Sequence, residues 1–162
     1  MPVDLEVYTL LHVVVSVLGI LSGLIVVGGL IAGARFPRLI TVFLVSTLVT
    51  TLSGFGFPFT KVTPAHVVGV VSLLTLAGAF LAYYGKGLRG GWLDVFVVLG
   101  TASLYLNVFV LFAQLLQRLP ALAPLSPAPS SPAFAITQGL VLLAFVLLGR
   151  VAMKGARSHR TA

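Results

Sequence analysis

Residues 7–33 read VYTLLHVVVSVLGILSGLIVVGGLIAG, an apolar run without an acidic or basic side chain. A hydrocarbon core about 30 Å thick needs about 20 helical residues at about 1.5 Å rise each, so this run can cross a bilayer as one helix. Four more apolar runs follow, at residues 39–59, 65–85, 93–116 and 133–152. The sequence predicts an all-α integral membrane protein, a single membrane domain over residues 1–162 built as a bundle of five transmembrane helices.

The composition supports this class and excludes others. Hydrophobic residues make up 59% of the chain and charged residues 8%, which leaves a soluble domain without a polar surface. A transmembrane β-barrel needs strands of about ten residues with alternating apolar and polar side chains, and these runs do not alternate. Lipid is therefore the expected solvent for most of the chain.

Charge placement predicts the orientation, because Lys and Arg accumulate in short loops on the cytoplasmic side. With five spans, eight of the ten basic residues fall on one side of the membrane: Arg35, Arg38, Lys86, Arg89, Arg150, Lys154, Arg157 and Arg160. Lys61 and Arg118 fall on the other side, together with Asp4 and Glu6. We expect the N-terminus outside and the basic tail at residues 153–162 in the cytoplasm.

The net charge of +7 invites a nucleic-acid partner, but the basic residues are divided between two short loops and a tail. Topology explains them, and we expect no nucleic acid. The predicted partners are the lipid bilayer and either a partner membrane protein or a second copy of the chain. The absence of cysteine removes disulfides, thiol catalysis and thiolate metal sites together.

The outer connection between the last two spans, residues 119–132, is rich in proline. Proline favours extended backbone without a helix, so this segment is predicted to be a rigid cap or a simple spacer. The prolines are Pro120, Pro124, Pro127, Pro129 and Pro132.

Polar residues inside the spans hold the remaining information, since a polar group in hydrocarbon needs a partner. At 100° per residue, four positions of the first span fall within about 40° of one another, which predicts a face packed on another helix. They are His12, Ser16, Gly19 and Gly23. In the fourth span, Asn107 is the deepest strong hydrogen-bonding side chain, and we expect it to face the interior with His12, Thr50, Ser53 or Gln138 as its partner.

Six polar side chains belong to the outer half of the predicted bundle: His12, His66, Asn107, Gln114, Gln138 and Ser53. One interpretation is hydrogen bonding between helices, at typically about 0.6 kcal/mol and up to ~2 kcal/mol per contact. The other is an outward-facing pocket for a small molecule, a quinone headgroup or haem. His12 and His66 are the candidate metal ligands, because neutral imidazole binds haem iron and copper.

Catalysis is unsupported by any motif, because no nucleophile and base occur at a recognisable spacing. Ion-coupled transport normally needs a charged side chain at mid-depth in the membrane, and the spans contain none. We expect a structural or accessory protein, or a ligand-binding bundle, and not an enzyme. The alternatives are a haem- or quinone-binding redox accessory and a small permease-like transporter.

Three segments also resemble a family of small, uncharacterised bacterial membrane proteins. They are SGFGFPF at residues 53–59, TPAHVVG at residues 63–69 and LYLNVFV at residues 104–110. The resemblance covers roughly residues 40–150. It implies a multi-pass protein of a bacterial inner membrane and supplies no activity. It also directs attention to the outer ends of the second and third spans and the middle of the fourth.

Overall fold

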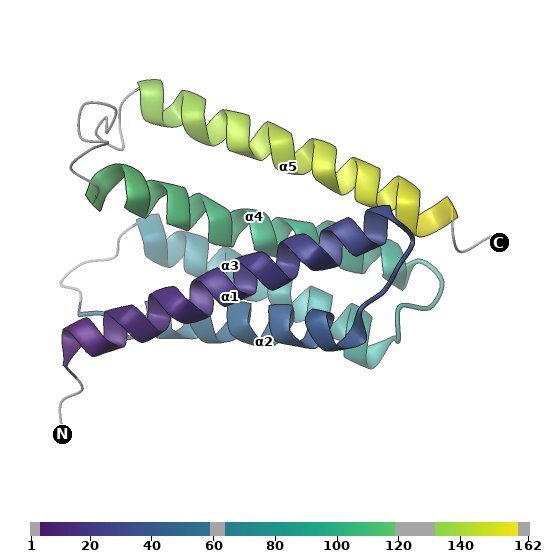
Figure 1. Ribbon diagram of the computed structural model, residues 1–162, viewed down its shortest axis with the longest axis horizontal. Coiled ribbons are helices and arrows are strands. Elements are labelled where there is room, and N and C mark those ends of the chain that lie inside the picture. Colours follow the sequence, from purple (N-terminus) through teal and green to yellow (C-terminus); the bar gives the residue numbers. More distant parts are fainter. Residues whose placement is uncertain (1–3, 59–63, 119–131, 159–162) are drawn as a thin grey trace.

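The computed structural model describes residues 4–58, 64–118 and 132–158, and this part of the chain is helical between its turns (Figure 1). The elements are α1 (Leu5–Ile31), α2 (Pro37–Gly54), α3 (Pro64–Phe80), the π-helical turn η1 (Leu81–Gly85), α4 (Trp92–Arg118) and α5 (Pro132–Ser158). Five helices are long and apolar enough to span a membrane, with η1 completing the third. The predicted loop at residues 119–132 lies outside the described residues up to residue 131, and so do residues 159–162 of the tail.

The helix ends follow from local chemistry. Three of the helices begin at a proline, whose missing N–H costs nothing in the first helical turn. At the start of α1, Asp4 Oδ1 accepts a hydrogen bond from the Glu6 backbone N–H at 3.2 Å. At its end, Gly33 takes a φ of 71°, and the next N–H, of Ala34, reaches back to Gly29 O at 2.8 Å. This is a Schellman stop, which favours glycine because of the left-handed backbone.

The largest differences from the apolar runs are at the ends of two helices. The second run was expected to continue to residue 59, whereas α2 ends at Gly54, ahead of Gly56 and Pro58. The last run was expected to end at residue 152, whereas α5 continues to Ser158. Basic side chains are favourable in a last helical turn, and Arg157 lies in the last turn of α5.

The core is formed mainly by α1 to α4. Helix α1 packs along α2 and also contacts α4 and α5, so it lies near the centre of the arrangement (Figure 1). The fully buried Phe43 of α2 and Leu104 of α4 meet at Gly23 of α1. Gly19 lies against the side chains of the same two helices. The prediction that the Gly19 and Gly23 face packs on another helix is confirmed.

The two ends of the bundle differ in what they contain. The start of α1, the end of α2 and the start of α3 lie at one end, which we call the N-terminal end (Figure 1). The turn after α1, the loop between η1 and α4 and the end of α5 lie at the opposite end, the C-terminal end (Figure 1). These last three segments contain most of the chain's basic residues, so the segregation of charge seen in the sequence is also a segregation in space.

Helix α5 is attached differently from the others. In its membrane-spanning window 6% of residues are buried, against 44% in α4, although the mean hydropathies of the two windows are 2.0 and 2.2. At its C-terminal end α5 comes close to α1, because Gly155 lies directly against the backbone carbonyl groups of Leu30 and Ile31. Most of its length presents exposed apolar side chains, among them Leu140, Leu143 and Leu147.

Candidate functional site

The best-defined polar contact at the N-terminal end joins α1 to α2. His12 Nδ1 lies 2.7 Å from Ser53 Oγ, and the same hydroxyl donates to Thr50 O at 3.1 Å. Ser53 has a single hydroxyl proton, so both bonds form together only when His12 carries its ring proton on Nδ1. The Nε2 lone pair of His12 is then left to accept a hydrogen bond or to bind a metal.

Aromatic side chains surround this contact. The Tyr8 hydroxyl donates to the backbone carbonyl of Ser53 at 2.7 Å, one turn of α1 before His12. The Phe57 ring stands edge-on to Tyr8 and His12, with ring centroids 4.9 Å and 5.2 Å away. The first turns of α1 are thereby fixed to the end of α2. We call the group of Tyr8, His12, Ser53 and Phe57 the histidine cluster.

A second polar group lies near the middle of the bundle. Ser16 Oγ of α1 donates to Asn107 Oδ1 of α4 at 3.3 Å, and Asn107 is 8% exposed. A Cβ placed on Gly19 would lie 3.0 Å from Thr47 Oγ1 and 3.3 Å from Asn107 Nδ2. Glycine at this position therefore lets polar atoms from α2 and α4 converge on α1. We call Ser16, Gly19, Thr47, Thr50 and Asn107 the polar centre.

Hydrogen bonding in the polar centre is incomplete. Thr47 Oγ1, Thr50 Oγ1 and Asn107 Nδ2 are all buried and have no hydrogen-bond partner in the structure. Buried groups of this kind usually have a partner, and each one left without costs roughly 1–3 kcal/mol. The polar centre therefore contains three buried polar atoms whose hydrogen-bonding capacity is unused.

Hydroxyl pairs connect α3 to its two neighbours. Thr51 Oγ1 of α2 lies 3.3 Å from Ser72 Oγ, and Ser103 Oγ of α4 donates to Thr75 Oγ1 at 2.9 Å. Their contacts fix the position of α3 relative to α2 and α4.

The six predicted site residues are distributed over several contacts. His12 and Ser53 meet directly, and Asn107 joins α1 one turn further along, at Ser16. His66 is half-buried at the start of α3, where its ring centroid is 5.8 Å from that of Phe55.

The two glutamines among the six lie outside the histidine cluster and the polar centre. Gln138 Nε2 of α5 donates to Phe109 O at 3.4 Å, and Gln114 is exposed. Among the described residues, no three His, Cys, Asp or Glu side chains gather in one place.

Periodicity in the sequence did not indicate a groove between α4 and α5. It has a volume of about 350 Å³, and apolar side chains from both helices form most of its lining. Two polar residues also line it, Thr101 of α4 and Arg150 of α5. The Thr101 hydroxyl is buried and has no hydrogen-bond partner.

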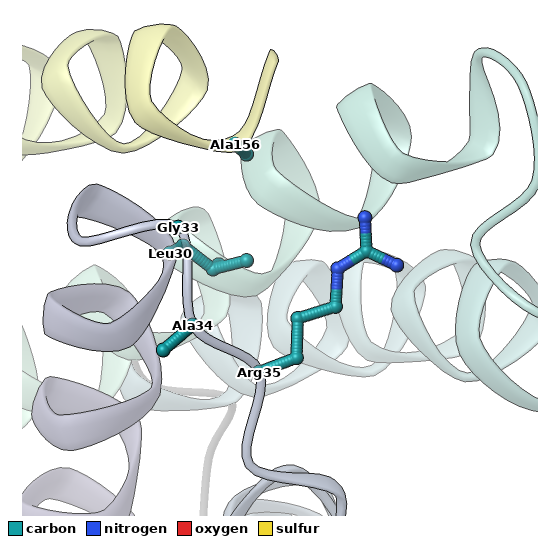
Figure 2. Close-up of a pocket in the computed structure, with 5 residues that line it drawn as sticks. All are labelled: Leu30, Gly33, Ala34, Arg35 and Ala156. Atoms are coloured by element: carbon teal, nitrogen blue, oxygen red, sulfur yellow. The ribbon is translucent and has the colours of Figure 1, made fainter. Parts of the chain in front are cut away.

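A smaller hollow of about 250 Å³ lies at the C-terminal end, beside the turn after α1 (Figure 2). Its lining is Leu30, Gly33, Ala34, Arg35 and Ala156. Figure 2 shows the Arg35 side chain extended away from the turn, with its guanidinium at the far end. One exposed cation without a nucleophile beside it can attract an anion, and it offers no catalytic chemistry.

An ion pair joins α4 and α5 at the same end. Arg157 of α5 donates to both carboxylate oxygens of Asp94 in α4, with Nε and Nη2 at 3.1 Å and 2.8 Å. This bidentate geometry is the favourable one for an Arg and a carboxylate. The two partners lie 63 residues apart in the sequence, so no local pattern indicates the pair.

Comparison of the chain with known family models, with curated proteins and with solved structures gives no match. The resemblance to small bacterial membrane proteins therefore stays a prediction, and the function has to be argued from the geometry.

Proposed function

We propose that this chain is a five-span protein of a bacterial inner membrane, with its N-terminus outside and its C-terminal tail in the cytoplasm. The segregation of basic residues supports this orientation, because short loops rich in Lys and Arg stay in the cytoplasm. The turn after α1, the loop before α4 and the end of α5 form that basic end (Figure 1). The exposed apolar surface of α5 supports a lipid environment.

We infer further that the protein is a structural or accessory bundle and not an enzyme. One observation supports this above all, namely that the polar side chains within the spans contact one another across helix interfaces. Asn107 joins Ser16, and His12 joins Ser53. Such contacts fix helix register at about 0.6 kcal/mol each in a membrane, and they leave the outer surface to act on partners.

A double-mutant cycle at the polar centre tests this inference. Ser16→Ala, Asn107→Leu and the double variant are unfolded in mixed micelles, and their free energies of unfolding are compared. If the contact between these side chains fixes the helices, the two substitutions couple by about 0.6 kcal/mol, with an upper bound of ~1.7 kcal/mol. Strict additivity would contradict a structural role for the contact.

A second candidate function is a haem- or quinone-binding redox accessory, and the histidine cluster favours it. Ser53 holds His12 by Nδ1, which is how ligating histidines are usually oriented, and so leaves Nε2 as the metal-binding nitrogen. His12 would hold haem iron through Nε2, and haem would supply one-electron redox chemistry there. An absorbance band in the Soret region that is lost in His12→Ala, and kept in His66→Ala, would assign that role.

The permease-like alternative has less support. It requires a polar path at mid-depth, and the two cavities described above lie beside the turn after α1 and between α4 and α5. Among the described residues, the buried polar side chains are those of Ser, Thr, Asn and Gln, and none of them carries a charge. Transport of a labelled solute into vesicles containing the purified protein would revive this alternative.

A further inference from the structure

We propose that the groove between α4 and α5 binds an anionic phospholipid, with an acyl chain between the two helices and the phosphate on Arg150. This inference goes beyond the accessory role. It requires only that the bundle lies in a bilayer.

The groove has the size and lining that an acyl chain needs. Its volume is about 350 Å³. The apolar side chains that line it are Val98, Ala102, Tyr105, Leu142, Phe145 and Val146. Along α5 the groove runs from Met153 to Leu142, which is about 16 Å of helix at about 1.5 Å per residue. An acyl chain entering beside Arg150 would therefore extend toward the middle of the membrane.

Arg150 gives the groove a charge that the protein itself does not neutralise. The chain contains three acidic residues, and two of them, Asp4 and Glu6, belong to the opposite end of the bundle. The third, Asp94, holds Arg157 through both carboxylate oxygens. No ion pair to Arg150 occurs among the described residues. Within the part of the chain that the structure describes, Arg150 is thus open to an anion from outside.

The depth of Arg150 identifies the source of that anion. Arg150 precedes Arg157 by two helical turns, which places it about 10 Å further into the membrane. A lipid phosphate is an anion that reaches this position from the membrane surface, and contact with it offsets part of the cost of placing a charged side chain in the membrane.

A second polar group lies next to Arg150. Thr101 is 6% exposed, lines the groove, and has a hydroxyl group without a hydrogen-bond partner. It faces Gly149, whose Cβ, if present, would lie 3.4 Å from Thr101 Cγ2. The hydroxyl oxygen itself is buried, so the charged group that the groove presents to a ligand is the Arg150 side chain.

Native mass spectrometry of the full chain in mild detergent tests the proposal with two defined lipids, phosphatidylglycerol and phosphatidylcholine. We expect at least about fivefold stronger retention of phosphatidylglycerol, the factor that one basic residue contributes at an anionic surface. Arg150→Gln should abolish that preference. The matched control is Lys154→Gln, one turn along the same helix and outside the groove lining, which should leave the preference for phosphatidylglycerol in place. Ala102→Phe, which fills the groove, should reduce the retention of both lipids.

Four outcomes would overturn the proposal. Equal loss in the two charge variants would mean that the basic end attracts lipid without a site. Equal retention of both lipids by the unmodified chain would exclude selection of the phosphate. Unchanged retention in a folded Ala102→Phe variant would exclude the groove, and Val98→Trp, at an exposed position on its rim, replaces that variant if it does not fold. A dimer that expels phosphatidylglycerol would assign the groove to a second copy, which also overturns the proposal.

Discussion

Gly23→Ala provides the sharpest test of how α1 is held. A Cβ at this position would lie 2.8 Å from Leu104 Cδ1 and 2.8 Å from two ring carbons of Phe43. Carbon atoms in contact prefer a separation of about 3.5–4.0 Å, so the new methyl group would lie roughly 0.7 Å or more too close to these carbon atoms. Leu104 and Phe43 are both 0% exposed, and neither can move without displacing other core residues.

The expected magnitude combines two opposing effects. Overpacking by a methyl group costs about 1–3 kcal/mol, while replacing glycine by alanine inside a helix contributes about 0.5–1 kcal/mol of stability. The net expectation is a loss of about 1 kcal/mol, with an upper value near 2.5 kcal/mol. Gly28→Ala is the matched control, because Gly28 lies on the same helix with nothing within 4 Å of its Cβ position. That variant shows the helical gain alone.

Equilibrium unfolding in mixed micelles with increasing sodium dodecyl sulfate measures the difference. The chain has a single tryptophan, Trp92 at the start of α4, so its fluorescence reports unfolding alongside the far-ultraviolet circular dichroism. Coincidence of the two transitions is needed before free energies are compared. If Gly23→Ala is as stable as Gly28→Ala, the close packing of α1 on Phe43 and Leu104 is refuted.

Three further predictions use other contacts. A cysteine in place of Asp4 should be labelled from outside intact cells and one in place of Gly87 should not, and the reverse pattern would overturn the proposed orientation. Asp94→Arg should lower the thermal stability measured in detergent, and the charge-swapped double variant with Arg157→Asp should recover part of the loss; absence of recovery would mean that the ion pair contributes nothing. Gly33→Ala should lower the free energy of unfolding by about 1 kcal/mol because of the φ of 71°, and unchanged stability would contradict the Schellman stop.

The five helices could be predicted from the sequence because lipid imposes a simple requirement. A backbone in hydrocarbon must satisfy its own hydrogen bonds, so every long apolar run becomes a helix whatever its neighbours are. Helical phase also predicted the face of α1 that holds Gly19 and Gly23, since residues three or four apart share a face. The ends of the helices could not be predicted as closely as their number. The apolar Phe55, Phe57 and Phe59 extended the second run beyond Gly54, where α2 stops.

Partners across helices could not be predicted in the same way. Asn107 was expected in the interior, with His12, Thr50, Ser53 or Gln138 as its partner, and it does lie in the interior. Its partner is Ser16, on the predicted face of α1 but one turn beyond His12. Periodicity fixes the direction in which a side chain points about the axis of its helix. It does not fix how far two helices are shifted along their axes relative to each other. The bidentate contact of Asp94 with Arg157 was missed for the same reason.

The smaller buried share of α5 cannot be predicted from hydropathy. Lipid chains are as apolar as leucine, so a helix surrounded by lipid and one surrounded by protein need the same composition. The windows in α4 and α5 differ in mean hydropathy by little, 2.2 against 2.0, while their buried shares are 44% and 6%. Small residues and polar contacts decide which helices pack. In α5 the close approach of Gly155 to α1 and the ion pair from Arg157 both lie at the C-terminal end.

The distribution of contacts locates where this protein can act on other molecules. Helices α1 to α4 use their polar side chains on one another, through the histidine cluster, the polar centre and the hydroxyl pairs on α3. Helix α5 contacts α4 at Gln138, Phe145 and Arg157, presents exposed leucines over most of its length, and among the described residues has no carboxylate paired with Arg150. An accessory protein binds its partners through such a surface, because side chains that already contact one another inside the bundle are not available to bind other molecules. Substitutions on the exposed face of α5 should therefore change lipid or partner binding at little cost in stability, whereas those in the polar centre should do the opposite.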